Sequence, residues 1–369
     1  MYRIAHLTSA HPRYDTRIFV KQCRSLAAHG HEVTLVVADD EGDAERDGVR
    51  IVDVGRLRGR VNRMLRTTRR VFEQALALDA EVYHLHDPEL IPTGLKLKRL
   101  GKKVIFDAHE DVPSQLLAKP YLGRWSRQVA ASSFSVFERY ACCRFDGIVA
   151  ATPFIRDKFL PINACTVDIN NFPVLGEFDA AAPWGAKAAQ VCYVGSIAAI
   201  RGIRELLGAC TLLRSPTRLA LAGAFSESAL ESEMHAHPGW VRIDALGHLN
   251  RDGVGTVMAA SIAGLVTLHP VVNYLDALPV KMFEYMAAGI PVIASDFPLW
   301  RSIIEHSDCG ICVNPADPQA IAAAIDYFVA NPRVAQRMGQ NGRLAVTEEY
   351  NWQCQSNKLI AFYDALESK

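Results

Sequence analysis

The chain has 369 residues, which is too long for one ordinary hydrophobic core and favours two domains. Half of the residues are hydrophobic and 22% are charged, so the composition excludes an intrinsically disordered chain. Lysine and arginine total 40, as do aspartate and glutamate, and this balance gives no reason to expect nucleic acid as a partner. The opening residues lack the pattern of a secretory signal, and no apolar run reaches the roughly 18–20 residues that span a bilayer. We therefore expect a cytoplasmic protein.

Short β-rich runs alternate with helix-like segments along the first half of the chain. The predicted strands and helices of this half are residues 2–8, 16–29, 32–38, 81–86, 89–100, 102–109 and 147–152. The second half repeats the alternation, and an amphipathic helix then follows without a further strand; these segments are residues 190–196, 203–213, 217–224, 261–270, 279–296 and 352–366. The strands carry no polar alternation, which indicates burial on both faces of a parallel sheet with helical crossovers.

Two such series predict an α/β protein made of two doubly wound, Rossmann-like domains. The irregular stretch 172–190, rich in proline, alanine and glycine, separates them. We predict an N-terminal domain over 1–176, with a C-terminal helix at 350–369 packing back on it, and a C-terminal domain over 177–349. Because open α/β sheets bind ligands beyond the carboxyl ends of their strands, we expect a cleft between the domains.

A dinucleotide-dependent dehydrogenase is the main rival for such a fold. Its fingerprint is G-x-G-x-x-G directly after the first strand. In this chain the first strand runs into TSAHPRYD, which contains no glycine. The missing fingerprint argues against that class.

The stretch DALPVKMFEYMAAGIPVIASD, which begins at Asp276, places two carboxylates and an amine around the start of one short helix. Proline favours a first helical turn, so we predict a helix from Pro279 to Ala288. Its N-terminal N–H groups form an anion site, and Lys281 adds a cation suited to phosphate. Glu284 and Asp276 can accept hydrogen bonds from hydroxyl groups, so the pattern fits a nucleotide sugar. The alternative is that both acids only favour the helix start and that Lys281 is solvated.

The spacing Asp276-x(7)-Glu284, with FEYMAAGIPVIASD around and behind the glutamate, resembles the E-x(7)-E motif of the family-four retaining glycosyltransferases of the GT-B fold. HPRYDTRIFVKQCRSLAAHGHEVTLV resembles the N-terminal segment of bacterial capsule, exopolysaccharide and O-antigen members of that family. VYHLHDPEL, FDAHEDVP, YVGSIAAIRG and LALAGA resemble further family landmarks. The resemblance covers nearly the whole chain and is specific for the family but not for the sugar.

The resemblance implies that Glu284 binds the nucleotide ribose and that Asp276 contacts the donor hexose. Asp276 is one methylene shorter than the glutamate of the family, which changes the expected contact with the sugar. Further residues expected to contact the donor phosphates or the nucleobase, partly through their main chain, are Leu278, Val280, Gly247 and His248.

The phosphate-binding segment departs from the family pattern at one position. The family commonly has G-R-x(n)-K-G, with both cations on the diphosphate, where this chain has YVGSIAAIRGI. Ser196 stands at the arginine position and Arg201 at the lysine position. Arg201 and Lys281 are then the phosphate pair, acting where a metal ion acts in other transferases, so neither a metal nor a cofactor is expected. Gly195 lets the backbone approach the phosphate closely.

The histidine of FDAHED follows a buried strand, at the edge where open sheets bind ligands. The resemblance implies that His109 contacts the donor sugar or the reacting centre, although an isolated histidine can equally be a structural hydrogen-bond partner. Alternation along a strand predicts that His84 and His86 point to opposite faces, which argues against joint metal ligation, and that His84 is core. The acceptor-side candidates near these strand ends are Asp15, His86, Asp87 and Glu110.

Two segments of the N-terminal domain favour a membrane surface. Residues 56–70, RLRGRVNRMLRTTRR, contain seven arginines and no acid, and residues 115–140 mix aromatic and aliphatic side chains with lysine and arginine. Cations beside aromatic anchors suit anionic lipid headgroups. The alternatives are a solvated helix face beside a core helix, or RNA, for which no binding module is legible.

Together these features predict a metal-independent, retaining hexosyltransferase of surface polysaccharide biosynthesis. The donor is a nucleotide-diphosphate sugar, and the acceptor is a lipid-linked glycan or an oligosaccharide. The N-terminal domain is expected to touch the inner face of the cell membrane. The alternatives are a GT-B sugar-nucleotide epimerase, which a product assay separates, and a non-catalytic assembly protein that binds nucleotide sugar without transferring it.

Overall fold

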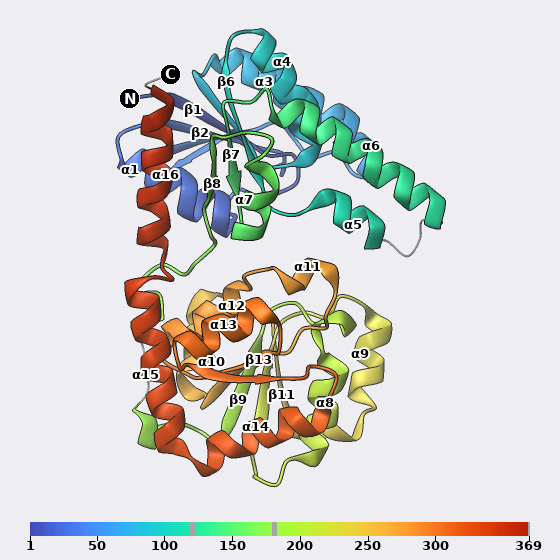
Figure 1. Cartoon of the computed structure of the whole chain (residues 1–369), viewed down its shortest axis with the longest axis vertical. Helices are drawn as coiled ribbons and strands as arrows, with labels where there is room; N and C mark the ends of the chain where they lie inside the picture. The colour runs from blue at the N-terminus through green and yellow to red at the C-terminus, as the bar shows by residue number, and fades with distance from the viewer. Residues whose placement is uncertain (119–122, 179–182, 368–369) are drawn as a thin grey trace. The chain divides into compact units, whose positions relative to one another are not determined.

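The computed structural model describes residues 1–118, 123–178 and 183–367. Contacts within the chain divide it into two compact units, which are drawn in Figure 1. Unit 1 comprises Met1–Asn171 and Cys354–Lys369, and unit 2 comprises Phe172–Gln353. These boundaries lie a few residues from the expected ones at 176/177 and 349/350. Part of the predicted irregular stretch, residues 179–182, and part of the aromatic-basic stretch, residues 119–122, lie outside the described residues.

Unit 1 is built on an eight-stranded sheet in the order β3-β4-β2-β1-β5-β6-β7-β8. All neighbouring strands are parallel except β3 and β4. The strands are β1 (Arg3–Leu7), β2 (Glu32–Val37), β3 (Ala44–Arg46), β4 (Val49–Asp53), β5 (Val82–Leu85), β6 (Lys103–Ala108), β7 (Gly147–Ala150) and β8 (Thr166–Asp168). Strands β5 and β7 are buried along their whole length, and β1 is buried beyond its exposed first residue, Arg3, as expected for a sheet covered on both faces.

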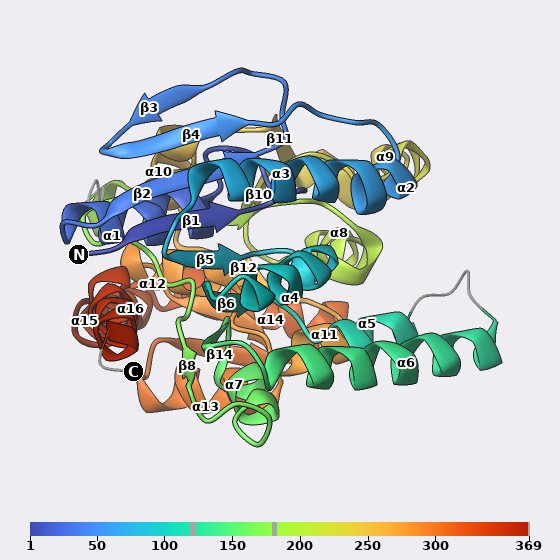
Figure 2. The same ribbon diagram turned by 90° about the horizontal axis from the view of Figure 1, so that it is seen from above.

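Helices cover this sheet. They are η1 (Thr16–Cys23), α1 (Arg24–Ala28), α2 (Arg60–Asn62), η2 (Arg63–Thr67), α3 (Thr68–Leu78), η3 (Pro88–Leu90), α4 (Ile91–Arg99), α5 (Val112–Ala118), α6 (Arg124–Cys142), α7 (Pro153–Phe159) and α16 (Trp352–Glu367). Side chains of α3, α4 and α6 share one core cluster, and Figure 2 shows these three helices along the same side of the sheet. The C-terminal helix α16 belongs to unit 1, where the hydroxyl of its buried Tyr363 lies 2.8 Å from Nδ1 of His84.

Unit 2 is built on a six-stranded parallel sheet in the order β11-β10-β9-β12-β13-β14. The strands are β9 (Gln190–Val194), β10 (Arg218–Ala222), β11 (Ile243–Gly247), β12 (Ala263–Val266), β13 (Val292–Ser295) and β14 (Gly310–Val313). Cys192 and Val194 of β9 enter one core cluster, and Val191 and Tyr193 enter the other. Successive strand residues point to opposite faces, so the sheet is buried on both sides.

The helical elements of unit 2 follow the predicted crossovers. They are η4 (Trp184–Ala186), η5 (Ala199–Arg201), α8 (Ile203–Leu212), α9 (Ser228–His235), η6 (Pro238–Arg242), α10 (Arg251–Ala260), α11 (Val272–Leu275), α12 (Val280–Ala287), α13 (Pro298–His306), α14 (Pro318–Ala330) and α15 (Pro332–Glu348). The predicted class, two Rossmann-like α/β domains, is confirmed. Over the described residues, no helix combines the length and the apolar character needed to cross a bilayer.

Candidate functional site

Unit 2 gathers two cations around the glycine that follows β9. Gly195 has a φ of +122°, a conformation that side chains other than glycine rarely adopt. A Cβ atom placed there would lie 3.2 Å from Nζ of Lys281 and 3.9 Å from Nη1 of Arg201. Lys281 and Arg201, the residues predicted to form a phosphate pair, therefore converge on Gly195. Since glycine has no side chain, the backbone there stays accessible beside both cations.

Lys281 is a buried cation without a counterion bonded to it. Its ammonium is buried, and no acceptor in the described part of the chain bonds to it. Nζ lies 3.7 Å from the centre of the Tyr193 ring, which offers only a cation–π contact. Burial and the nearby charge of Arg201 lower the pKa of Lys281 to about 7. Burying an unpaired charge is unfavourable, so an anion bound at this ammonium would stabilise its charged form.

Glu284 is held by an arginine that the motif reasoning missed. Glu284 is 6% exposed, and its Oε1 accepts a hydrogen bond of 2.7 Å from Nη1 of Arg251. Nε of Arg251 donates to Oε1 of Glu177 at 2.6 Å, and the guanidinium lies 4.9 Å from the centre of the Phe178 ring. The segment that begins at Arg251 is not among the predicted helices; in the structure Arg251 is the first residue of α10, where the helix dipole disfavours a cation.

The loop before α12 agrees with the predicted layout, with one correction. The helix begins at Val280 rather than at Pro279, which is its N-cap residue with φ −69° and ψ 120°. Asp276 follows α11 and is exposed, so its carboxylate is open to a ligand. Leu278, in the loop after Asp276, and Val280, the first residue of α12, are partly buried. The sugar, phosphate and ribose roles of this segment stay predictions.

The predicted nucleobase residues lie at the end of β11. Gly247 closes the strand with a φ of +64°, and it and His248 are exposed in the short loop that leads to α10. Arg251 is the first residue of that helix, so this loop lies next in the chain to the residue that holds Glu284. Ser196 is exposed beside Gly195, and its carbonyl accepts a hydrogen bond of 2.8 Å from the Tyr193 hydroxyl.

In unit 1 a buried carboxylate organises the ends of the central strands. Asp107 of β6 accepts two hydrogen bonds from Arg17, of 3.0 Å and 2.7 Å, and one of 2.7 Å from Nε2 of Gln22. Nitrogens of His86 and His109 each lie 3.2 Å from its Oδ2. Although burial favours the neutral carboxyl, the charge of Arg17 and the bond to His109 hold the pKa of Asp107 well below its usual range. Sequence reasoning named His109 but not Asp107.

His109 follows β6 and is partly exposed, as expected. Its ring lies 5.2 Å from that of His11. His11 has Asp15 and Asp87 on either side, each with a nitrogen–oxygen distance of 3.4 Å. Although burial opposes it, the hydrogen bond with Asp15 and the charge of Asp87 raise the pKa of His11.

The expectation that His84 and His86 point to opposite faces is wrong. Their rings stack with centroids 4.8 Å apart and an angle of 20° between the planes. The expectation misapplied the strand period: neighbouring residues of a strand point to opposite faces, whereas residues two positions apart, such as His84 and His86, point to the same face. His86 is 2% exposed, and burial lowers its pKa to about 3, so it is a neutral partner of Asp107. We assign it to holding this network rather than to contact with an acceptor.

Three further acceptor candidates have structural partners. Asp87 is 3% exposed and accepts hydrogen bonds from the hydroxyl of Thr8 and from the backbone and hydroxyl of Ser9, so it orders that loop. Asp15 caps η1 by accepting from two backbone N–H groups. Although burial opposes it, the bond with His11 lowers the pKa of Asp15 to about 2. Glu110 is exposed and accepts a hydrogen bond from Gln115.

Two sets of side chains at this edge bring possible metal ligands within 4.8 Å of one another. In His86, Asp107 and His109 the carboxylate oxygens are already occupied by Arg17 and Gln22. The other set is His6, His84 and His86, which contains no carboxylate and in which Nδ1 of His6 and Nε2 of His86 bond to each other at 2.8 Å. Neither donor set suits a hard divalent ion, and we assign a metal to neither.

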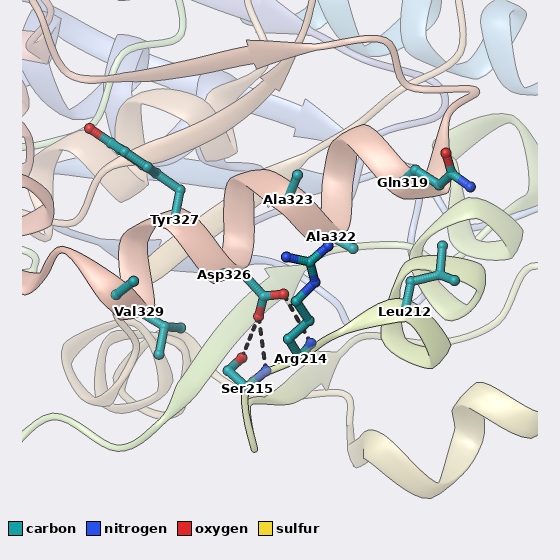
Figure 3. Close-up of a pocket in the computed structure, with 10 residues that line it drawn as sticks. Leu212, Arg214, Ser215, Gln319, Ala322, Ala323, Asp326, Tyr327 and Val329 are labelled. Carbon is teal, nitrogen blue, oxygen red and sulfur yellow. Dashed lines mark hydrogen bonds between the residues drawn. The ribbon is translucent and has the colours of Figure 1, made fainter.

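A hollow of about 890 Å³ lies elsewhere in unit 2, between α14 and the loop that precedes β10. Figure 3 shows the carboxylate of Asp326 accepting hydrogen bonds from this loop. The donors are the backbone N–H groups of Arg214, at 2.9 Å, and of Ser215, at 3.1 Å. The loop leads into the N-terminal end of β10, whereas Gly195 follows the C-terminal end of β9. Since β9 and β10 are parallel, the hollow and Gly195 lie at opposite ends of these strands. It does not belong to the candidate site.

Comparison with known families bears on both units. Residues 16–167 match the family described as "Glycosyl transferase 4-like domain", and residues 177–345 match "Glycosyl transferases group 1". The two matches together span most of the chain. The chain belongs to the family-four glycosyltransferases of the GT-B fold.

Individual relatives of this glycosyltransferase are distant. The MMP alpha-(1->4)-mannosyltransferase of Mycolicibacterium hassiacum is 23% identical over 168 residues, which are 45% of this chain and 40% of that protein. Among solved structures, sucrose-phosphate synthase from Thermosynechococcus elongatus has a TM-score of 0.79 at 18% identity and covers 100% of both chains. HepE of Anabaena in complex with UDP-glucose has a TM-score of 0.75 at 13% identity, over 99% of this chain and 100% of that one. These likenesses show the fold. The matched segment spans less than half the length of the curated relatives.

Proposed function

We propose that this glycosyltransferase moves a hexose from a nucleotide-diphosphate sugar to a glycan acceptor with retention of configuration. The observation that carries the proposal is the buried, unpartnered ammonium of Lys281, which meets Arg201 at Gly195 and shares a helix with Glu284. The donor class is supported by the UDP-glucose bound to HepE. Retention is supported by the likeness of the Asp276–Glu284 spacing to the motif of retaining enzymes.

The chemistry follows from where negative charge develops. As the bond from the sugar to the diphosphate breaks, charge accumulates on the leaving phosphate oxygens. Cations fixed in advance at that place stabilise the transition state without reorganising. Lys281 and Arg201 supply two such charges, while the carboxylates of Glu284 and Asp276 accept hydrogen bonds from ribose and hexose hydroxyls. In unit 1, the pair of Asp107 and His109 presents a partly exposed imidazole at the strand ends.

The proposal is tested by incubating the purified chain with UDP-hexoses and GDP-hexoses and a bacterial lipid extract. We expect release of nucleoside diphosphate that depends on the extract, together with labelled glycolipid. Free sugar or an isomerised nucleotide sugar, formed equally without acceptor, would identify a sugar-nucleotide epimerase instead. Donor binding with no product of either kind would identify a non-catalytic binding protein.

Metal dependence gives a second check on the leaving-group account. Because Lys281 and Arg201 take the place of a divalent ion at the diphosphate, transfer should keep its full rate after exhaustive treatment with EDTA. The measurement is the initial rate with and without chelator, followed by added magnesium or manganese. A rate that collapses with EDTA and returns with either ion would contradict the role given to the two cations.

A lipid-linked acceptor is supported by the surface of unit 1. On α6, four large apolar side chains are more than 45% exposed and recur at helical spacing: Trp125, Val129, Val136 and Tyr140. The segment of α2 and η2 exposes three more, Val61, Met64 and Leu65. Exposed arginines accompany both groups, such as Arg58, Arg66 and Arg139. Apolar side chains beside cations suit the surface of an anionic membrane.

Not all seven arginines of residues 56–70 are available to a membrane. Nε of Arg63 lies 2.8 Å from Glu89, and Arg69 is paired with Glu73 at the same distance. Replacing the exposed Arg56, Arg58 and Arg66 with serine should weaken binding to anionic vesicles by up to about 3 kcal/mol, at about 1 kcal/mol for each cation. Cosedimentation with anionic and neutral vesicles at low and high salt measures this.

The control replaces two exposed arginines of unit 2, Arg214 and Arg333, with serine. Vesicle binding by that variant should equal that of the wild type. Equal binding of the wild type to anionic and neutral vesicles would leave residues 56–70 as an ordinary solvated surface.

A further inference from the structure

The positive charge of Arg251 lies at a position that is electrostatically unfavourable. Arg251 is the first residue of α10, whose N-terminal N–H groups already carry a partial positive charge, and Asn250 caps that helix. The guanidinium is nevertheless fixed on three sides, by Glu284 at 2.7 Å, Glu177 at 2.6 Å and the ring of Phe178 at 4.9 Å. Burial works against its charge, but the bonds to the two carboxylates raise the pKa of Arg251.

Glu284 depends on this contact more than Arg251 does. The side chain of Glu284 is 8% exposed, whereas that of Arg251 is 45% exposed. A buried carboxylate keeps its charge only when it is paired and hydrogen-bonded. Arg251 bonds to Oε1 alone, and no described residue donates a hydrogen bond to Oε2. Arg251 thus pairs with the carboxylate of Glu284 and fixes its orientation while leaving one oxygen for a ligand.

We propose that Arg251 is a positioning residue for donor recognition: it holds Glu284 as an oriented carboxylate so that Oε2 accepts a hydrogen bond from a ribose hydroxyl of the nucleotide. Glu177 holds the other edge of the guanidinium, so the segment before β9 takes part in setting the ribose contact. This inference rests on the proposed function, because it needs a nucleotide at Glu284.

The test compares nucleotides that differ only in the ribose. Binding of UDP, 2′-deoxy-UDP and 3′-deoxy-UDP, and of the three matching guanosine diphosphates, is measured by calorimetry on the full chain. The wild type should prefer a ribose over its deoxy form by a factor on the order of 10 to 100, the range for a hydrogen bond to a charged group. Arg251→Met should reduce that preference to less than about threefold, while Arg251→Lys should retain part of it.

A double-mutant cycle separates positioning from a general structural effect. Glu284→Gln should lose the same preference, and adding Arg251→Met to it should cause no further loss, because both changes remove one contact. Arg218→Met is the control. Arg218, the first residue of β10, makes a bidentate ion pair with Asp244 of β11. That variant should keep the wild-type ribose preference, and thermal unfolding should show that every variant is folded.

The outcomes distinguish this inference from the proposed function. If the wild type binds either diphosphate and Arg251→Met retains its full ribose preference, the positioning role is overturned and the transferase proposal stands. Additive losses in the double variant would also overturn it. If the folded wild type binds neither diphosphate at millimolar concentration, the proposed function itself fails, and the inference fails with it.

Discussion

Replacing Lys281 with methionine should lower kcat/KM by a factor on the order of 10² to 10³, the range for removing one preorganised charge-stabilising group. The same change should leave the fold intact and raise the midpoint of thermal unfolding. The reason is that methionine removes an ammonium that is buried without a hydrogen-bond acceptor, which is an unfavourable element of the ligand-free structure. Initial rates at saturating acceptor and a thermal melt of the same preparation measure both effects.

Lys187 provides the matched control. It is another partly buried lysine of unit 2, but its ammonium donates to the carbonyls of Ala259 and Ser261, at 2.6 Å and 3.0 Å, at the end of α10. Lys187→Met should therefore lower the unfolding midpoint and spare kcat/KM. If Lys281→Met kept wild-type turnover, or if both variants behaved alike, Lys281 would not be the group that neutralises the leaving diphosphate.

Affinity for nucleoside diphosphate should fall as the pH rises above 7, by up to tenfold per pH unit. Burial and the charge of Arg201 lower the pKa of Lys281 to about 7 in the free protein. A bound diphosphate favours the charged lysine and raises that pKa, so binding takes up a proton in the window between the two values. Above about pH 7 the free protein must first be protonated, which weakens binding. Calorimetry from pH 6 to 9, in buffers of different ionisation enthalpy, measures affinity and proton uptake together.

Lys281→Arg isolates this effect, because arginine does not titrate in the range. That variant should bind with an affinity that changes little between pH 7 and 9 and should take up no proton. The groups around the ammonium that bear on the result are Arg201, Glu284 and Cys192. An equally steep fall of affinity in the arginine variant would assign the titration to another group.

Much of the arrangement that we propose for donor binding could be predicted from local spacing. Lys281 and Glu284 are three residues apart, and on a helix this places them on adjacent positions of one surface. Gly195 and Arg201 follow β9, and the end of its apolar run in the sequence indicates where this strand ends. These features depend on one element at a time, and the geometry of a single helix or strand is readable from its sequence. For the same reason the α/β class, with buried parallel strands, could be predicted before any contact was known.

Local reasoning failed where a residue's surroundings come from distant parts of the chain. Asp107 carried no motif signal of its own, and its partner Arg17 is 90 residues away in the sequence. Its role is visible only in the folded chain, where Arg17 and Gln22 of η1 bond to it at the end of β6.

The sequence by itself determined the fold class and the two repeating α/β units, and it placed Lys281 and Glu284 on one short helix, because these depend on periodicity and short spacing. Only the tertiary structure decided how the charges in that segment behave. Packing around α12 buries the ammonium of Lys281, and burial is what lowers its pKa to about 7. Arg251 reaches Glu284 across 33 residues of sequence because α10 and α12 pack into the same core cluster. The free energy of a charge depends on its solvation and its neighbours, and both are set by chain segments that come together only in the folded protein.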